Sequence, residues 1–219
     1  MQREVNHYIS NAMKVSASSP ARRIGRPRSF DRDAALDAAM HLFWSQGFEA
    51  TSISDLIRTM GITPPSLYAA FGDKRQLFRA CIERYLGGGG AATIVRSIAH
   101  AVSARDAAHD LLTAAAVGDT GDSTPPGCLL ASSIVSSSAD AADMREELAI
   151  IRREIEAALR ARIRRDVDEG ILPRDSDAEA LAGHVFAVVQ GMSTLAKDGA
   201  DRDKLLRIVS SVMMCWPRA

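Results

Sequence analysis

The sequence has few of the residues that build metal centres and disulfide frameworks. Its 219 residues include three cysteines and five histidines. Cys81, Cys128 and Cys215 are odd in number and lie far apart, so they indicate no disulfide framework and do not have the spacing of a zinc site. We therefore expect no metal centre.

Motifs for cofactor binding, membrane insertion and catalysis are also missing. The glycine run at 87–90 is followed by no Lys-Ser/Thr pair, so it indicates a flexible joint rather than a phosphate-binding loop. No apolar stretch reaches the length of about 18 residues that a membrane span needs, and residues 1–19 lack the apolar centre of a secretory signal. The sequence predicts a cytoplasmic protein without a cofactor. It has neither a His-x-x-x-His pair nor a serine nucleophile elbow, which argues against an enzyme.

Charge of one sign is not in excess over the whole chain, but it is unevenly distributed. The chain has 27 Lys and Arg against 27 Asp and Glu. Residues 1–75 contain ten basic and seven acidic residues, and the remainder contains seventeen and twenty. A basic N-terminal part is typical of a nucleic-acid-binding domain.

The segment from Thr51 to Lys74 carries the most specific pattern. Ser52 followed by Asp55 three residues later is a capping box that begins a helix. Apolar residues then recur every three or four positions, and Gly61 ends the helix at a turn. This pattern predicts a short helix over 53–60 with one buried face.

A second short helix follows the turn. Thr63 caps it and Pro64 stands at its first position, where the missing N–H costs nothing. Leu67 and Phe71 face the core because they lie four residues apart. The positions left facing outward carry small side chains: Ser66, Ala69 and Ala70. Two helices joined by a tight turn, the second able to enter a major groove, form a helix-turn-helix. Tyr68 and Lys74 beside it have the chemistry to hold phosphates.

The rest of the chain also indicates helices and no strand, so the predicted fold class is all-α. Asp31 caps a helix to about Gln46, with Trp44 closing a small core, and a helix over 74–86 supports it. The further predicted helices are 91–104, 106–117, 128–138, 140–169, 176–197 and 201–216. We expect a flexible basic arm over 1–29, a DNA-binding domain over 30–75 and a second helical domain over 76–219.

The run from Phe30 to Leu77 resembles the DNA-binding domain of the tetracycline-repressor (TetR) family of bacterial transcription regulators. The resemblance implies a helical effector and dimerisation domain, and release of DNA when an effector binds. The matching positions extend to Phe78, and they are Ala35, Ala38, Leu42, Phe43, Gly47, Phe48, Thr51, Ser52, Leu56, Met60, Gly61, Ile62, Ser66, Leu67, Tyr68, Phe71, Lys74 and Leu77.

The resemblance also implies roles for individual residues. Those that would hold phosphates are Thr51, Ser52, Tyr68 and Lys74, and those that would face base edges are Pro64, Pro65, Ser66, Ala69 and Ala70. The chain departs from the family pattern at Pro64-Pro65, where a Lys-Gly pair is common, and at Ala69-Ala70, where an aromatic-His pair is usual. Both changes favour apolar contacts such as those to thymine methyl groups. The operator sequence therefore cannot be transferred from relatives.

The arm preceding this domain contains Arg26-Pro27-Arg28, an extended basic segment. Narrow minor grooves attract such arginines. We expect Arg26 or Arg28 to contact a minor groove, and the alternative is that the arm is a solvated tail.

Two long helices predict a homodimer, since a helix-turn-helix usually reads two half-sites about 34–36 Å apart. Apolar stripes at helical spacing lie within 140–169 and within 176–197, and pairing these helices with their mates makes a four-helix interface. Some stripe positions must belong to the core of the protomer. The prediction therefore concerns the helices rather than each residue.

The effector site is the least specified part of the sequence. Candidate lining residues are His109, His184, Gln190 and Met192, each of which also fits a core or surface role. Cys128 follows Pro125-Pro126-Gly127 at a predicted helix start, where the macrodipole would lower its thiol pKa and make it a sensor of oxidants or electrophiles. A small buried hydrophobe is the alternative role for this cysteine.

The sequence therefore predicts a dimeric transcriptional repressor that binds a palindromic operator in double-stranded DNA. A small-molecule effector, or modification of Cys128, would release it. Two other functions stay open: a catalytic helical bundle with an accessory DNA-binding domain, and an interaction module whose helix-turn-helix no longer binds DNA.

Overall fold

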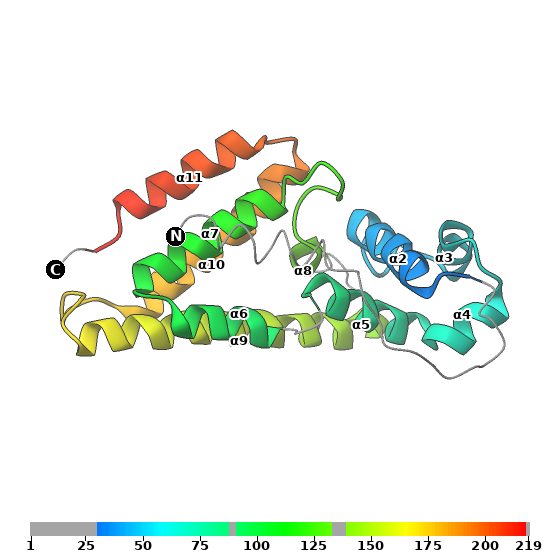
Figure 1. Ribbon diagram of the computed structural model, residues 1–219, viewed down its shortest axis with the longest axis horizontal. Coiled ribbons are helices and arrows are strands. Elements are labelled where there is room, and N and C mark those ends of the chain that lie inside the picture. The colour runs from blue at the N-terminus through cyan, green and yellow to red at the C-terminus, as the bar shows by residue number, and fades with distance from the viewer. Residues whose placement is uncertain (1–29, 88–90, 133–138, 218–219) are drawn as a thin grey trace, which may run out of the picture.

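The computed structural model describes residues 30–87, 91–132 and 139–217, and these residues form ten α-helices without a strand. The predicted all-α class is confirmed (Figure 1). The helices are α2 (Arg32–Gln46), α3 (Ile53–Met60), α4 (Pro64–Phe71), α5 (Lys74–Tyr85), α6 (Ala91–His100), α7 (Ala104–Gly118), α8 (Leu129–Ser132), α9 (Ala139–Asp168), α10 (Ala178–Lys197) and α11 (Arg202–Met214).

Local signals set the ends of the N-terminal helices. Asp31 caps α2 by accepting bonds from the N–H groups of residues 33 and 34, and the Ser52–Asp55 capping box begins α3. Gly61 ends α3 in the left-handed conformation, with φ of 66°. Thr63 caps α4, whose first residue is Pro64. Each of these predicted boundaries is confirmed.

The first hydrophobic core joins α2–α5 to the nearer end of the larger domain. Phe43, Phe48 and Phe78 pack together at its centre, with ring centroids 5.0 to 6.0 Å apart. Trp44 is buried as expected, edge-on to Tyr85 at 4.9 Å. Leu77 and Phe78 of α5 are buried in this core, and so are residues of α8 and α9: Leu129, Leu130, Met144 and Leu148. The small helical unit thus obtains the support it needs.

The second core is formed by α6, α7, α9, α10 and α11. Figure 1 shows α2–α4 at one end of the molecule, with the 30-residue α9 running along the length of the remaining domain. The exposed ion pairs Arg75–Asp143 (3.0 Å) and Arg79–Glu147 (2.5 Å) attach α5 to the beginning of α9. The buried residues of α5 belong to the first core, whereas α9 contributes buried residues to both cores, so α9 connects the two cores and α5 joins α2–α4 to it.

The turn between α6 and α7 differs from the sequence prediction. Helix α6 ends at His100 rather than near Ala104, and α7 begins at Ala104. Asp166 accepts a 2.6 Å bond from the backbone N–H of Ala104, and Arg162 donates to the carbonyl of Val102 at 2.7 Å. Because both partners lie on α9, no local pattern revealed this break. Residues 88–90 and 133–138, part of the predicted joint and helix, lie outside the described residues.

The predicted dimer stripes lie largely inside the protomer. On α9 the buried members are Met144, Leu148, Ile155, Leu159 and Ile163, and on α10 they are Ala182, Val185 and Met192. Met144 and Leu148 pack in the first core, and the others pack in the second core, where α9 and α10 contact α6 and α7. Another face of α10 is exposed: Ala180, His184, Ala187 and Gly191.

Candidate functional site

Helix α4 presents an exposed face at the end of the molecule (Figure 1). Leu67 and Phe71 are buried and hold the helix on the first core. Tyr68 is 53% exposed, which is unusual for a large aromatic side chain without an exposed function. The other exposed positions on this helix are Pro64, Pro65 and Ala69.

Two of the predicted base-reading positions are less accessible. Ser66 is half-buried and its hydroxyl lies 2.9 Å from that of Thr63, within hydrogen-bond distance. Ala70 is half-buried and packs against the first core. The outward surface of α4 therefore consists mainly of Pro64, Pro65, Tyr68 and Ala69. All but Tyr68 lack a side-chain hydrogen-bonding group.

The hydroxyl groups before α3 are already engaged. Thr51 is 0% exposed and donates a 2.7 Å bond to the carbonyl of Gly47, so its side chain shapes the turn and does not face solvent. This burial argues against the predicted contact of the Thr51 side chain with a phosphate. Ser52 is exposed, but its Oγ lies 2.6 Å from Asp55 Oδ2 and accepts the N–H of Asp55 at 3.1 Å. The hydrogen bonds that the Ser52 hydroxyl and the Ser52 backbone N–H donate to the Asp55 carboxylate, together with Arg58, lower the pKa of Asp55.

Lys74 begins α5 beside this face. Its Nζ lies 4.6 Å from the centroid of the Phe48 ring, a cation–π contact, and donates to the carbonyl of Glu49 at 3.4 Å. Partial burial lowers the pKa of Lys74, and the charge of Glu49 opposes that shift. An ammonium held in this way at a helix N-terminus can meet a phosphate with little loss of side-chain entropy.

Two arginines near the face were not among the predicted contacts. The guanidinium of Arg32 stacks 4.6 Å from the Phe71 ring centroid, and the side chain of Arg58 is 77% exposed while pairing with Asp55. A basic residue on an exposed helix is a weak signal by itself, so the sequence did not single them out. Arg26 and Arg28 lie outside the described residues.

A second constellation lies where α8 meets the first core. The indole N–H of Trp44 donates a 2.7 Å bond to the carbonyl of Gly127. The next residue, Cys128, donates its backbone N–H to Ser193 Oγ at 2.8 Å and accepts the Tyr85 hydroxyl on its sulfur at 3.3 Å. A short stretch of the 119–128 loop therefore contacts α2, α5 and α10 at once.

The prediction for the Cys128 thiol was wrong in direction. Burial raises the pKa of Cys128, and the nearby Asp119 carboxyl raises it further. Hydrogen bonds from Tyr85 and from the first N–H groups of α8 oppose the shift but do not overcome it. Desolvation of the thiolate outweighs the effect of a four-residue helix. Asp119 is itself 2% exposed, and burial raises its pKa to about 7.

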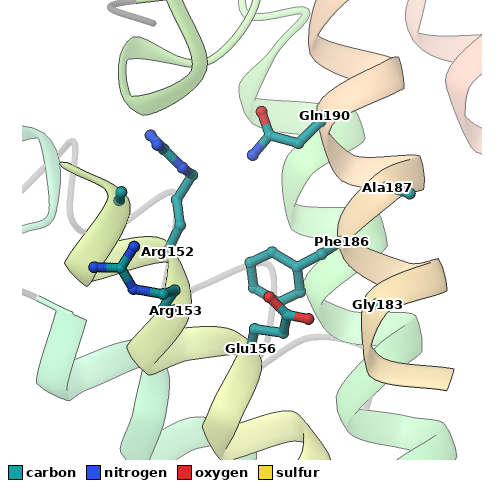
Figure 2. A pocket seen from close by; sticks show the side chains of 8 residues that line it. Arg152, Arg153, Glu156, Gly183, Phe186, Ala187 and Gln190 are labelled. Atoms are coloured by element: carbon teal, nitrogen blue, oxygen red, sulfur yellow. The ribbon is translucent and has the colours of Figure 1, made fainter. Parts of the chain in front are cut away.

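The other candidate effector residues do not lie together at one site. His109 and His184 are exposed, and Met192 is buried in the second core. Gln190 lines a groove between α9 and α10 (Figure 2). Within the described residues no group of three or more His, Cys, Asp or Glu side chains could hold a metal ion. In the same part of the chain, no helix is long and apolar enough to cross a membrane.

A helix-turn-helix with an exposed second helix, attached to a helical domain, defines the class: a DNA-binding transcriptional regulator. Two family models match the chain: "Bacterial regulatory proteins, tetR family" over residues 35–81, and "Tetracyclin repressor-like, C-terminal domain" over residues 107–212. The chain belongs to the TetR family.

Individual relatives agree with this assignment. The HTH-type transcriptional repressor ComR of Escherichia coli is 36% identical over 193 residues, which cover 88% of this chain and 92% of ComR. A cysteine mutant of the TetR family regulator CifR, complexed with 26 bp of double-stranded operator DNA, is 38% identical with a TM-score of 0.79. The match covers 88% of this chain and 100% of the CifR chain. A putative TetR regulator from Rhodococcus sp. RHA1 is 35% identical with a TM-score of 0.60, and covers 84% and 98%.

Proposed function

We propose that this protein is a repressor that binds a palindromic operator as a homodimer in the cytoplasm and leaves it when an effector binds. The observation that carries the proposal is the exposed face of α4 beside Lys74. In support, ComR is named a repressor and CifR was solved with operator DNA.

In the proposed complex, α4 enters the major groove. Tyr68 donates its hydroxyl to a phosphate, and Lys74 supplies a positive charge beside it. Pro64, Pro65 and Ala69 meet base edges through apolar contacts, which favours thymine methyl groups. Ser52 and Ser66 contact DNA only by exchanging their present hydrogen bonds, and Ala70 and Thr51 support the surface from behind.

The basic arm supplies most of the positive charge. Residues 1–29 contain six basic residues and one acidic residue, whereas residues 30–75 contain four and six. The helix-turn-helix itself thus has no positive excess. We propose that Arg26 and Arg28 reach the adjacent minor groove and provide this missing attraction.

Dimerisation is proposed through α9 and α10. The exposed residues of α10 at 180, 184, 187 and 191 lie at spacings of four, three and four, so they share one side of the helix. Three of the four are Ala or Gly, which permits close approach of a partner helix. Ile150 of α9 is 44% exposed, as expected of a residue that a partner covers.

Release of the operator would begin in the effector domain, by a small molecule or, as the second route, by modification of Cys128. The raised pKa of Cys128 makes the second route slow unless the loop first opens. The bond from Trp44 to Gly127 gives either event a direct connection to α2.

The test is selection of duplex DNA from a random pool by the intact protein, by Tyr68→Ala and by Tyr68→Phe, at near-physiological salt. We expect the intact protein to enrich a palindrome. Tyr68→Ala should weaken its binding about tenfold, and Tyr68→Phe should lose nearly as much if the hydroxyl makes the contact. Absence of enrichment by the intact protein, also at low salt, would reject DNA recognition.

A further inference from the structure

The groove between α9 and α10 borders the proposed dimer face at Ala187 and carries polar groups that the DNA-binding surface does not use. Its volume is about 490 Å³, within the range of small-molecule sites. Figure 2 shows Arg152 and Glu156 reaching into it from α9, and Phe186 and Gln190 from α10. The groove thus combines an aromatic wall with a cation, an amide and a carboxylate.

The guanidinium of Arg152 is the unusual group. Its Nη1 donates a 2.8 Å bond to the carbonyl of Leu130, and no carboxylate in the part of the chain that the structure describes lies within ion-pair distance of it. The adjacent Arg153, by contrast, pairs with Glu146 at 2.5 Å, and Arg160 pairs with Glu179 at 2.6 Å. Burial lowers the pKa of Arg152, an electrostatic interaction with Cys128 opposes that shift, and the charge of Arg153 adds to it. A half-buried cation without a counter-charge gains more from an anion than a solvated one does.

We propose that this groove binds a small organic monocarboxylate, and that this ligand is the effector. The effect of this ligand on DNA binding rests on the proposed function, whereas the binding of the carboxylate to the groove does not. The carboxylate pairs with Arg152 through two parallel bonds, and Gln190 donates an amide N–H to it. The apolar body packs on Phe186.

The opposite end of the groove sets the selectivity. In Figure 2 the carboxylate of Glu156 lies beside Phe186, away from the guanidinium of Arg152. A second carboxylate on the ligand would meet Glu156 and be repelled. Monocarboxylates are therefore preferred over dicarboxylates of the same length.

Binding has a path to the DNA-binding domain. A carboxylate competes with the Leu130 carbonyl for Arg152, and Leu130 lies two residues beyond Cys128 and three beyond Gly127. Loss of that bond releases the same short segment that accepts the indole N–H of Trp44. The ligand thereby favours a state in which α2 is held less firmly, and operator affinity falls.

The experiment is titration calorimetry of the full-length protein with hexanoate, octanoate, benzoate and phenylacetate, with the corresponding amides and with adipate and suberate. We expect at least one monocarboxylate to bind with a Kd below about 1 mM, and its amide to bind at least about tenfold more weakly. Arg152→Gln should abolish the binding, and Gln190→Ala should weaken it. The matched control, Arg160→Gln, removes another guanidinium of α9, one that pairs with Glu179 and does not line the groove, and this variant should bind normally.

Binding of no monocarboxylate, or equal binding by acids and amides, overturns the proposal. So does normal binding by a folded Arg152→Gln protein. Reduced dimerisation of Arg152→Gln in sedimentation, with no carboxylate binding to the intact protein, would assign Arg152 to the dimer interface instead. Operator affinity is measured separately, and the bound acid should lower it at least about fivefold. Acid binding without any DNA binding would reject the proposed function and leave the site standing.

Discussion

Arg162 and Asp166, one turn apart on α9, form an ion pair whose side chains are only 2% and 1% exposed. Asp166 also accepts the backbone N–H of Ala104, and Arg162 donates to the carbonyls of Ala101 and Val102. Among the described residues, the side-chain hydrogen bonds that the pair makes outside α9 are therefore all to the segment from Ala101 to Ala104, where α6 is followed by α7. The pair positions that turn, and with it the two helices that pack against α9.

Asp166→Asn should strongly destabilise the protein, because it leaves the Arg162 charge buried without a counter-charge. We expect the free energy of unfolding to fall by about 3 to 5 kcal/mol, measured by urea denaturation at constant protein concentration. Arg160→Gln breaks the more exposed pair with Glu179 and should cost less than about 1 kcal/mol. Equal losses in the two variants would contradict this account.

Gly127→Ala and Gly61→Ala separate backbone strain from a steric clash. Both glycines have positive φ, 80° and 66°, so both alanines are strained by about 1 kcal/mol. A Cβ at Gly61 meets no atom within 4 Å, whereas one at Gly127 lies 2.9 Å from the carbonyl oxygen of Ser193. Gly127→Ala should therefore lose about 2 kcal/mol more stability in thermal or urea unfolding. A similar loss of stability in both variants would contradict the steric account, because the loop at Gly127 would then have moved away from Ser193.

Cys128 should react slowly with iodoacetamide, because its pKa is raised and the thiolate is the reactive form. The exposed Cys215 should be modified at least about tenfold faster at pH 8, as followed by mass spectrometry of the peptides. Asp119→Asn removes a negative charge that raises the pKa of Cys128, so it should speed the reaction. The gain should appear above about pH 7, where Asp119 is ionised in the parent protein. An unchanged reaction rate in Asp119→Asn would show that the charge of Asp119 does not influence the Cys128 thiol.

Arg26→Ala together with Arg28→Ala should weaken operator binding and flatten its salt dependence. Each lost phosphate contact lowers the slope of log affinity against log salt by about 0.9. The measurement is fluorescence anisotropy at several salt concentrations. Arg22→Ala with Arg23→Ala, a matched pair further from the domain, should have a smaller effect. An unchanged slope in both double variants would indicate that the arm is solvated.

The sequence by itself determined the helix-turn-helix. Capping residues, helix-ending glycines and apolar repeats act between residues three or four positions apart, so the ends of α2, α3, α4 and α5 could be predicted. The position of Trp44 in the core and the supporting role of α5 followed from the same periodicity. Family resemblance over residues 30–77 added the class of function.

Only the tertiary structure decided what depends on distant residues. The break after His100 requires Arg162 and Asp166, and the burial of the Thr51 side chain requires the packed first core. The raised pKa of Cys128 comes first from its burial and then from the charge of Asp119. The lack of a counter-charge at Arg152 appears only when α8, α9 and α10 are placed together. Burial and charge arise from groups far apart in the chain, and a local pattern does not record which of them meet.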